Sequence, residues 1–403
     1  MKNCEVAETR KRMARAFENR AHPQNLAILQ DIIQKRHQIA VLLGFPSYSH
    51  LDLDSKMAKR PETARAFIDD LIPALQKKWA QELASLKENL HSSVILTADG
   101  SIPSYDIAFC MNYAKKTRLN VSETTIQEYF PLTSTVAALF DIYESFFAIR
   151  FEKLENAADL WFHEGVSTLV VRDAATSEVL GHVILDLFPR DGKFTHACCH
   201  SVIPPIRQSH DGSYSPALSV VIANFPKGTA DTPALFLHDD VETFFHEFGH
   251  AIHGLMGRSR MPTMAGTRVK RDFVELPSQM LEEWLWDSKI LQRVTKHYKT
   301  GEALPKELIA AKIASQNAFS GRDSLRQLVF ATYALELFGP SASSTVDTSQ
   351  VFYDIQDRIL PGIQFSRDTH FECAFGHLTG YAATYYGYMW SEVFAQDVFE
   401  YIR

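Results

Sequence analysis

The first part of the chain has the hydrophobic spacing of amphipathic helices. Residues 5–92 are helical in period, and the segment NLAILQDIIQKRHQIAVLLG places an apolar stripe along one helix that Gly44 would end. The stripe consists of Leu26, Ile28, Leu29, Ile32 and Ile33. A further helix begins at Pro61, and Pro73 inside it predicts a kink. After a loop at 97–104, residues 124–147 again predict helix.

The pattern then changes from helical spacing to alternation. Residues 167–189 alternate on both sides of a short polar connection, which predicts a β-hairpin, and residues 217–225 predict a third strand. Helices resume near Thr232 and continue to the end, interrupted by loops at 339–349 and 360–380. We therefore expect a mainly α, multi-helical fold with one small β-sheet. The change of pattern suggests two domains, 1–150 and 151–403.

Composition restricts the compartment and the partners. Hydrophobic residues make up 46% and charged residues 22%, which is ordinary for a soluble globular protein. The net charge is −7 with no basic stripe, so we expect no nucleic-acid partner. No apolar run is long enough for a membrane span, and the N-terminus predicts an amphipathic helix rather than a signal peptide. The five scattered cysteines predict neither disulfides nor a thiolate zinc site. These features favour a reducing compartment, which we expect to be the cytoplasm, with a mitochondrial or other organellar location left open. We also expect a monomer.

The segment HEFGH carries the first candidate chemistry. His246 and His250 are four residues apart and therefore lie on the same face of a helix, while Glu247 is rotated about a quarter turn away. This HExxH arrangement supplies two imidazole ligands for zinc and a carboxylate that acts as a general base. One alternative is a helix face that is rich in histidine by chance. Another is a structural zinc site, which would be closed and has no need of the glutamate.

A catalytic zinc site needs a third ligand. We reject His253, because seven residues place it roughly 10 Å along the helix axis from His246. Glu275 is the better candidate, because it precedes Pro277 at the apolar entrance of a following helix, where a buried carboxylate requires a partner. Glu282 and Glu283 are competitors on a segment for which a solvated helix face is the simpler explanation.

At HEFGH and DFVELPSQ the chain resembles the thimet oligopeptidase and neurolysin family of zinc peptidases, which includes oligopeptidase A and mitochondrial intermediate peptidase. The resemblance extends from CEVAETRKRMARAF through LDLFPRDGKFTHA and HDDVETFFHEFGHAIH to HLTGYAATYYGYMWSEVF. It implies a zincin-type fold with the small sheet beside the HExxH helix and a deep substrate channel. It also implies that one zinc ion per chain is bound by His246, His250 and Glu275.

The resemblance places four further residues on the substrate side: His377, Tyr381, Tyr385 and Tyr388. The segment GHLTGYAATYYGY is punctuated by glycine, and the three tyrosines recur at i, i+4 and i+7, so one helical face could present their phenols. A phenol can donate to the oxyanion of a tetrahedral intermediate. The alternative is that these are core aromatics at helical spacing; Tyr386, on another face, we assign to packing.

Together these features predict a zinc-dependent metalloendopeptidase that hydrolyses internal bonds of short oligopeptides. Glu247 would be the general base, and His377 with Tyr385 or Tyr388 would stabilise the oxyanion. Gln279, one turn beyond Glu275, would support the ligands. The chain is shorter than the family at both ends, so the alternative is a catalytically impaired form that binds peptides. Endopeptidase and dipeptidyl-carboxypeptidase action are both compatible with these motifs.

Overall fold

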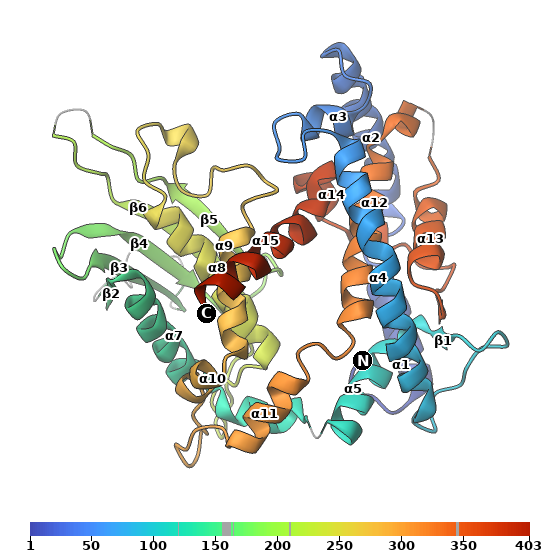
Figure 1. The fold of residues 1–403 in the computed structure, drawn as a ribbon, viewed down its shortest axis with the longest axis horizontal. Helices are drawn as coiled ribbons and strands as arrows, with labels where there is room; N and C mark the ends of the chain where they lie inside the picture. Colours follow the sequence, from blue (N-terminus) through green and yellow to red (C-terminus); the bar gives the residue numbers. More distant parts are fainter. Residues whose placement is uncertain (120, 155–162, 164, 209–210, 344–345) are drawn as a thin grey trace. The chain divides into compact units, whose positions relative to one another are not determined.

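The computed structural model describes residues 1–119, 121–154, 163, 165–208, 211–343 and 346–403 (Figure 1). The mainly helical fold with a small sheet is confirmed. The α-helices are α1 (Ala7–Glu18), α2 (Gln24–Leu42), α3 (Tyr48–Leu53), α4 (Pro61–Glu88), α5 (Ser104–Arg118), α6 (Glu123–Ile126), α7 (Leu132–Phe147), α8 (His238–Met256), α9 (Leu276–Glu282), α10 (Ser288–Val294), α11 (Lys306–Ala314), α12 (Ser320–Leu337), α13 (Thr348–Ile359), α14 (His377–Gly380) and α15 (Gly387–Ile402). The strands are β1 (Ile102–Pro103), β2 (Ile149–Lys153), β3 (Val166–Asp173), β4 (Val179–Asp186), β5 (Cys198–Ile203), β6 (Ala217–Ile222) and β7 (Ile363–Gln364).

The chain divides into two compact units that interleave along the sequence. Unit 1 contains residues 1–120, 270–273 and 314–390, and unit 2 contains residues 121–269, 274–313 and 391–403. The two domains that we predict from the change of pattern are continuous and meet at residue 150. The units differ from them because the helices after residue 314 join the N-terminal helices in one hydrophobic core.

Unit 1 is helical and is organised around α4 and α12, which lie side by side (Figure 1). Four side chains are fully buried in this core: Trp79 of α4, and Leu325, Leu328 and Tyr333 of α12. Pro73 lies inside α4 without ending it. The predicted apolar stripe of α2 is only partly buried: Leu29 and Ile33 are buried, whereas Ile28 is exposed.

Unit 2 contains a five-stranded sheet in the order β2-β3-β4-β6-β5, in which β4 and β6 are parallel and the other pairs antiparallel. The β3–β4 hairpin and strand β6 agree with the predicted strands. The sequence pattern misses β2 and β5. Both are edge strands, and because most of their side chains are at least partly exposed, they lack the apolar alternation of a buried strand.

Helix α8 packs between this sheet and α9. At Gly254 a Cβ would lie 2.8 Å from the Ser219 Oγ of β6, and at Gly249 it would lie 3.0 Å from the Ser278 Cα of α9. The two glycines therefore permit close contact with a neighbour on each side. Tyr143 of α7 also donates a hydrogen bond to the Phe245 carbonyl of α8 at 2.9 Å. In the part of the chain that the structure describes, no helix has the length and apolarity needed to cross a membrane.

Candidate metal centre

Helix α8 presents His246 and His250 from adjacent turns of one face. Their Nε2 atoms are 3.1 Å apart, and the two rings meet edge-on with centroids 4.7 Å apart. Both side chains are mostly buried, with exposed fractions of 18% and 13%. Two nitrogen atoms at this separation cannot both carry a hydrogen that points at the other. The arrangement therefore suits a shared proton or a shared cation.

Glu275 supplies the third donor from the entrance of α9. Its Oε2 lies 3.1 Å from the Nε2 of His246 and 3.1 Å from the Nε2 of His250. Glu275 occupies the N-cap position, the side chain is 2% exposed, and Pro277 lies in the first turn that follows. Ser278 donates to the Glu275 backbone carbonyl at 2.9 Å, which steadies this turn. The structure thus brings together the three residues that we predict as metal ligands.

The donor set fits a zinc ion. The three atoms form a triangle with sides of 3.1 Å. Donors at the usual distances from a tetrahedral zinc ion would lie about 3.3–3.4 Å apart, so only a small adjustment is needed. Two imidazoles and one carboxylate leave the fourth tetrahedral position open, which is the pattern of catalytic rather than structural zinc sites.

The charges in this cluster are strongly coupled. Burial alone would raise the pKa of Glu275, but the hydrogen bonds with His246 and His250 outweigh it and hold this pKa well below its usual value. Burial would lower the pKa of His246, whereas Glu275 and Glu282 raise it well above its usual value. The cluster therefore favours positive charge beside an ionised carboxylate.

Glu282 orients His246. Its Oε1 accepts a hydrogen bond from His246 Nδ1, which leaves Nε2 to face Glu275 and His250. The expectation that Glu282 lies on a solvated helix face is wrong, because its carboxylate contacts His246. The spacing contains a signal for this role, since Glu282 lies seven residues after Glu275, two turns along α9.

Glu247 is 8% exposed and lies on the same helix, beside the cluster. Burial raises its pKa, and the two histidines partly oppose the effect. Strand β5 packs against α8, and the negative charge of Glu247 adds to the increase that burial causes in the pKa of the Cys198 and Cys199 thiols. Glu247 therefore lies in a site bordered by β5 and the histidine pair.

His253 is not part of the donor cluster. Burial, followed by the charge of His250, lowers the pKa of His253 to about 4. This side chain is a neutral, packed histidine at ordinary pH, as expected from its distance along the helix.

The four residues predicted on the substrate side form a cluster in unit 1. The ring centroid of His377 lies 5.5 Å from that of Tyr381, 5.3 Å from Tyr385 and 5.7 Å from Tyr388. The single helix that their spacing suggests is divided into α14, the 3-10 helix η7 (Ala382–Tyr386) and α15, with Ala382 at a φ of 49°. His377 is exposed, Tyr381 and Tyr388 are half-buried, and Tyr385 is buried.

Two hydroxyl groups near this cluster have defined acceptors. Tyr385 donates to Gln327 Oε1 at 2.8 Å. Tyr386 is fully buried and donates to Asp272 Oδ2 at 2.7 Å, while Asp272 also accepts from the backbone N–H groups of Met57 and Ala58. Because its hydroxyl has this hydrogen-bond acceptor, Tyr386 can be buried within unit 1.

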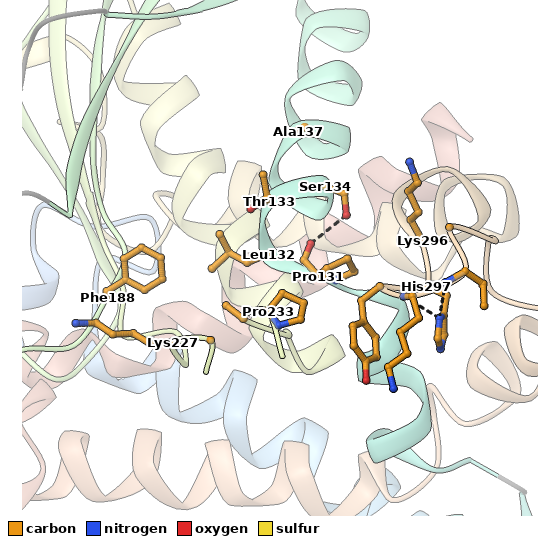
Figure 2. Close-up of a pocket in the computed structure, with 16 residues that line it drawn as sticks. Pro131, Leu132, Thr133, Ser134, Ala137, Phe188, Lys227, Pro233, Lys296 and His297 are labelled. Atoms are coloured by element: carbon orange, nitrogen blue, oxygen red, sulfur yellow. Dashed lines mark hydrogen bonds between the residues drawn. The ribbon is translucent and has the colours of Figure 1, made fainter. Parts of the chain in front are cut away.

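Unit 2 also holds an open cleft of about 850 Å³, separate from the donor cluster (Figure 2). Phe188 and Lys227 line one end, Lys296 and His297 line the other, and Leu132 and Pro233 lie between them. None of the predicted ligands lines this cleft. The candidate site is therefore identified by converging donor atoms and not by the volume of a cavity.

A helical fold with a small sheet and two HExxH histidines that meet a glutamate of the next helix defines the class of metallopeptidases. The sequence match is more specific: residues 1–403 match the family described as Peptidase family M3, and the chain belongs to this family. The predicted family resemblance is confirmed.

Several relatives have names that describe peptidases. The chain is 35% identical to saccharolysin of Saccharomyces cerevisiae over 99% of its own length and 57% of that protein. It is 31% identical to oligopeptidase A of Escherichia coli over 99% of its own length and 59% of that protein. It is 27% identical to a mitochondrial intermediate peptidase of Arabidopsis thaliana over 93% of its own length and 53% of that protein. The chain thus spans little more than half the length of these relatives.

A solved structure described as PZ peptidase A with an inhibitor has the same fold. Its TM-score is 0.56 at 14% sequence identity, and the match covers 98% of this chain and 60% of that chain. This likeness supports the architecture of the chain.

Proposed function

We propose that the protein is a zinc-dependent metalloendopeptidase that hydrolyses internal bonds of short oligopeptides. The observation that carries the proposal is the triangle of His246 Nε2, His250 Nε2 and Glu275 Oε2, with Glu247 buried on the same helix. Membership in a metallopeptidase family and the names of the relatives support it.

When bound, zinc supplies Lewis acidity that polarises the scissile carbonyl and lowers the pKa of the attacking water. His246, His250 and Glu275 would hold the ion, and Glu282 would keep His246 in the correct tautomer and orientation. Glu247 would accept the proton of the water as its oxygen attacks the carbonyl carbon. Glu247 would then deliver that proton to the leaving amine as the C–N bond breaks.

Strand β5 supports a peptide as the substrate. It is the last strand of the described sheet, it pairs on one side with β6, and it packs against α8, the helix that carries Glu247. A free strand edge offers N–H and C=O groups to any extended chain, whatever its side chains are. A peptide paired with β5 would place its backbone beside the proposed base.

The roles of His377, Tyr381, Tyr385 and Tyr388 stay predictions from the family resemblance. Because the Tyr385 hydroxyl already donates to Gln327, it would have to change partners to serve an oxyanion. Tyr385 and Tyr388 both stay candidates for the donor, together with His377. Changing the tyrosine that donates to phenylalanine should lower kcat by 10- to 1,000-fold with little change in KM, as expected for an interaction made in the transition state, and changing the other should have a much smaller effect. The cytoplasmic location and the monomeric state also stay predictions.

Cleavage of a fluorogenic oligopeptide tests the main proposal. Activity should disappear with a chelator and return with zinc. Glu247→Gln should keep zinc and lose nearly all turnover, whereas His246→Ala should lose both. Asp141→Asn, which removes an exposed carboxylate of α7, is the matched control.

Turnover by Glu247→Gln near the parent rate would refute the base assignment, and tight peptide binding without any turnover would favour the peptide-binding alternative. Mass spectrometry of the products distinguishes internal cleavage from dipeptide release.

A further inference from the structure

His238, the first residue of α8, is a fully buried histidine that the proposed reaction does not use. Its ring packs against Trp286, with centroids 4.6 Å apart, and edge-on to Phe130 at 6.0 Å. Its Nε2 faces the backbone carbonyl of Leu285 at 3.5 Å. Since a carbonyl can only accept, this contact favours hydrogen on Nε2 and leaves a lone pair on Nδ1.

The Nδ1 atom of His238 is buried and has no hydrogen-bond partner in the described part of the chain. It points towards Glu242, one turn later on α8, whose Oε2 is 3.5 Å away. The Glu242 side chain is 24% exposed, so one side of this contact is open to water. An imidazole lone pair and a carboxylate oxygen are both acceptors, so a stable arrangement needs a hydrogen-bond donor or a cation between them.

Asp239 adds a third oxygen donor at the same corner of the helix. The ligand atoms of His238, Asp239 and Glu242 all lie within 4.8 Å of one another. His238 and Glu242 are four residues apart and lie on one helix face, and Asp239 is three residues before Glu242. Small rotations of the two flexible carboxylate side chains would therefore bring the ligand atoms together. Asp239 is exposed, which leaves room for water ligands on a bound ion.

We propose that His238, Asp239 and Glu242 form a second divalent-cation site, at the start of the helix whose later turns carry His246 and His250. One imidazole nitrogen and two carboxylate oxygens suit zinc or another first-row ion better than calcium or magnesium. The positive end of the helix dipole opposes a cation here, but Asp239, Asp240 and Glu242 in the first turns offset it. The inference does not depend on the proposed peptidase activity.

Metal stoichiometry of the full chain provides the test. Protein stripped with a chelator is dialysed against zinc, and bound metal is measured by mass spectrometry. The parent should bind two ions per chain, and His246→Ala should keep one. Glu242→Gln and Asp239→Asn should each weaken the second site more than tenfold without loss of helical circular dichroism. The matched control, Asp141→Asn, should bind as the parent does.

Location is tested by anomalous diffraction from zinc-soaked crystals, which should give a peak at His238 Nδ1. His238 itself is a poor first target because a buried substitution can unfold the protein, so the exposed Asp239 and the partly exposed Glu242 carry the test. Loss of all bound metal in His246→Ala, or a second ion that persists in both carboxylate variants, would overturn the proposal.

Discussion

Gly249 lies directly against Ser278, because a Cβ on Gly249 would be only 3.0 Å from the Ser278 Cα and 3.2 Å from Leu281 Cδ1. This contact sets the separation of α8 and α9. It thereby places Glu275, three residues before Ser278, next to the imidazoles of His246 and His250. The glycine inside HEFGH is thus part of how the donor triangle is built.

Gly249→Ala should destabilise the protein, although alanine is the better helix former. Helix propensity favours alanine by about 1 kcal/mol, but overpacking against the α9 backbone should cost roughly 1–3 kcal/mol and move Glu275 away from the histidines. We expect a lower denaturation midpoint and weaker zinc binding. The control is Gly380→Ala in α14, where an added Cβ meets nothing within 4 Å. Equal effects of the two substitutions would show that the α8–α9 contact is not tight.

Glu282→Gln should weaken zinc binding by 10- to 100-fold, the usual effect of removing a carboxylate that orients a ligating histidine. The amide retains the shape of the side chain but accepts less strongly from His246 Nδ1. Competition with a chromophoric chelator measures the affinity. Glu283→Gln removes the same charge from the next residue, whose carboxylate accepts from Gln396 instead, and serves as the control. A similar loss in both variants would indicate a general charge effect.

The sequence predicts the three residues of the donor triangle better than it predicts Glu282, the residue that orients His246. Two histidines at i and i+4 must share a helix face, which is a local rule. The choice of Glu275 rests on a local rule too, because a glutamate before a proline at an apolar entrance needs a partner, and also on the family resemblance. Glu282 was missed because a carboxylate on a half-exposed helix has the same pattern whether it contacts water or His246. No local rule states which helix α9 packs against.

The same distinction holds for the fold. Periodicity identifies α2, α4 and the β3–β4 hairpin because each buries one face. It fails at β5, an edge strand with few buried side chains, and at Ile28, which has the period of a buried residue but is 56% exposed. The interleaved units depend on contacts between α4 and α12, more than two hundred residues apart, which no local pattern encodes.

Arg10 and Asp106 form a buried ion pair in unit 1, with side chains 0% and 2% exposed and a distance of 2.6 Å between Nε and Oδ1. Arg10→Met should destabilise the protein by about 3–5 kcal/mol, because the remaining carboxylate is buried without its partner. Adding Asp106→Leu should restore much of the loss. Arg15→Met, which breaks an exposed pair with Asp368, should cost less than about 1 kcal/mol. Urea denaturation measures all four proteins, and no recovery in the double variant would contradict this explanation.

Glu392 of α15 should make stability depend on pH in a defined direction. Burial, followed by the charges of Glu282 and Glu283, raises its pKa from 4.5 to about 7. Between these values the folded protein holds a proton that the unfolded chain has released, so this group lowers the free energy of unfolding as pH rises from 4.5 to 7. Glu392→Gln removes the ionisable group and with it this fall in the free energy of unfolding. In metal-free protein the variant should therefore have a higher urea midpoint than the parent at pH 8 and the same midpoint at pH 4. Glu400→Gln, an exposed glutamate of the same helix, should show no such difference. A gain for Glu392→Gln that is equal at both pH values would mean that packing, and not ionisation, accounts for it.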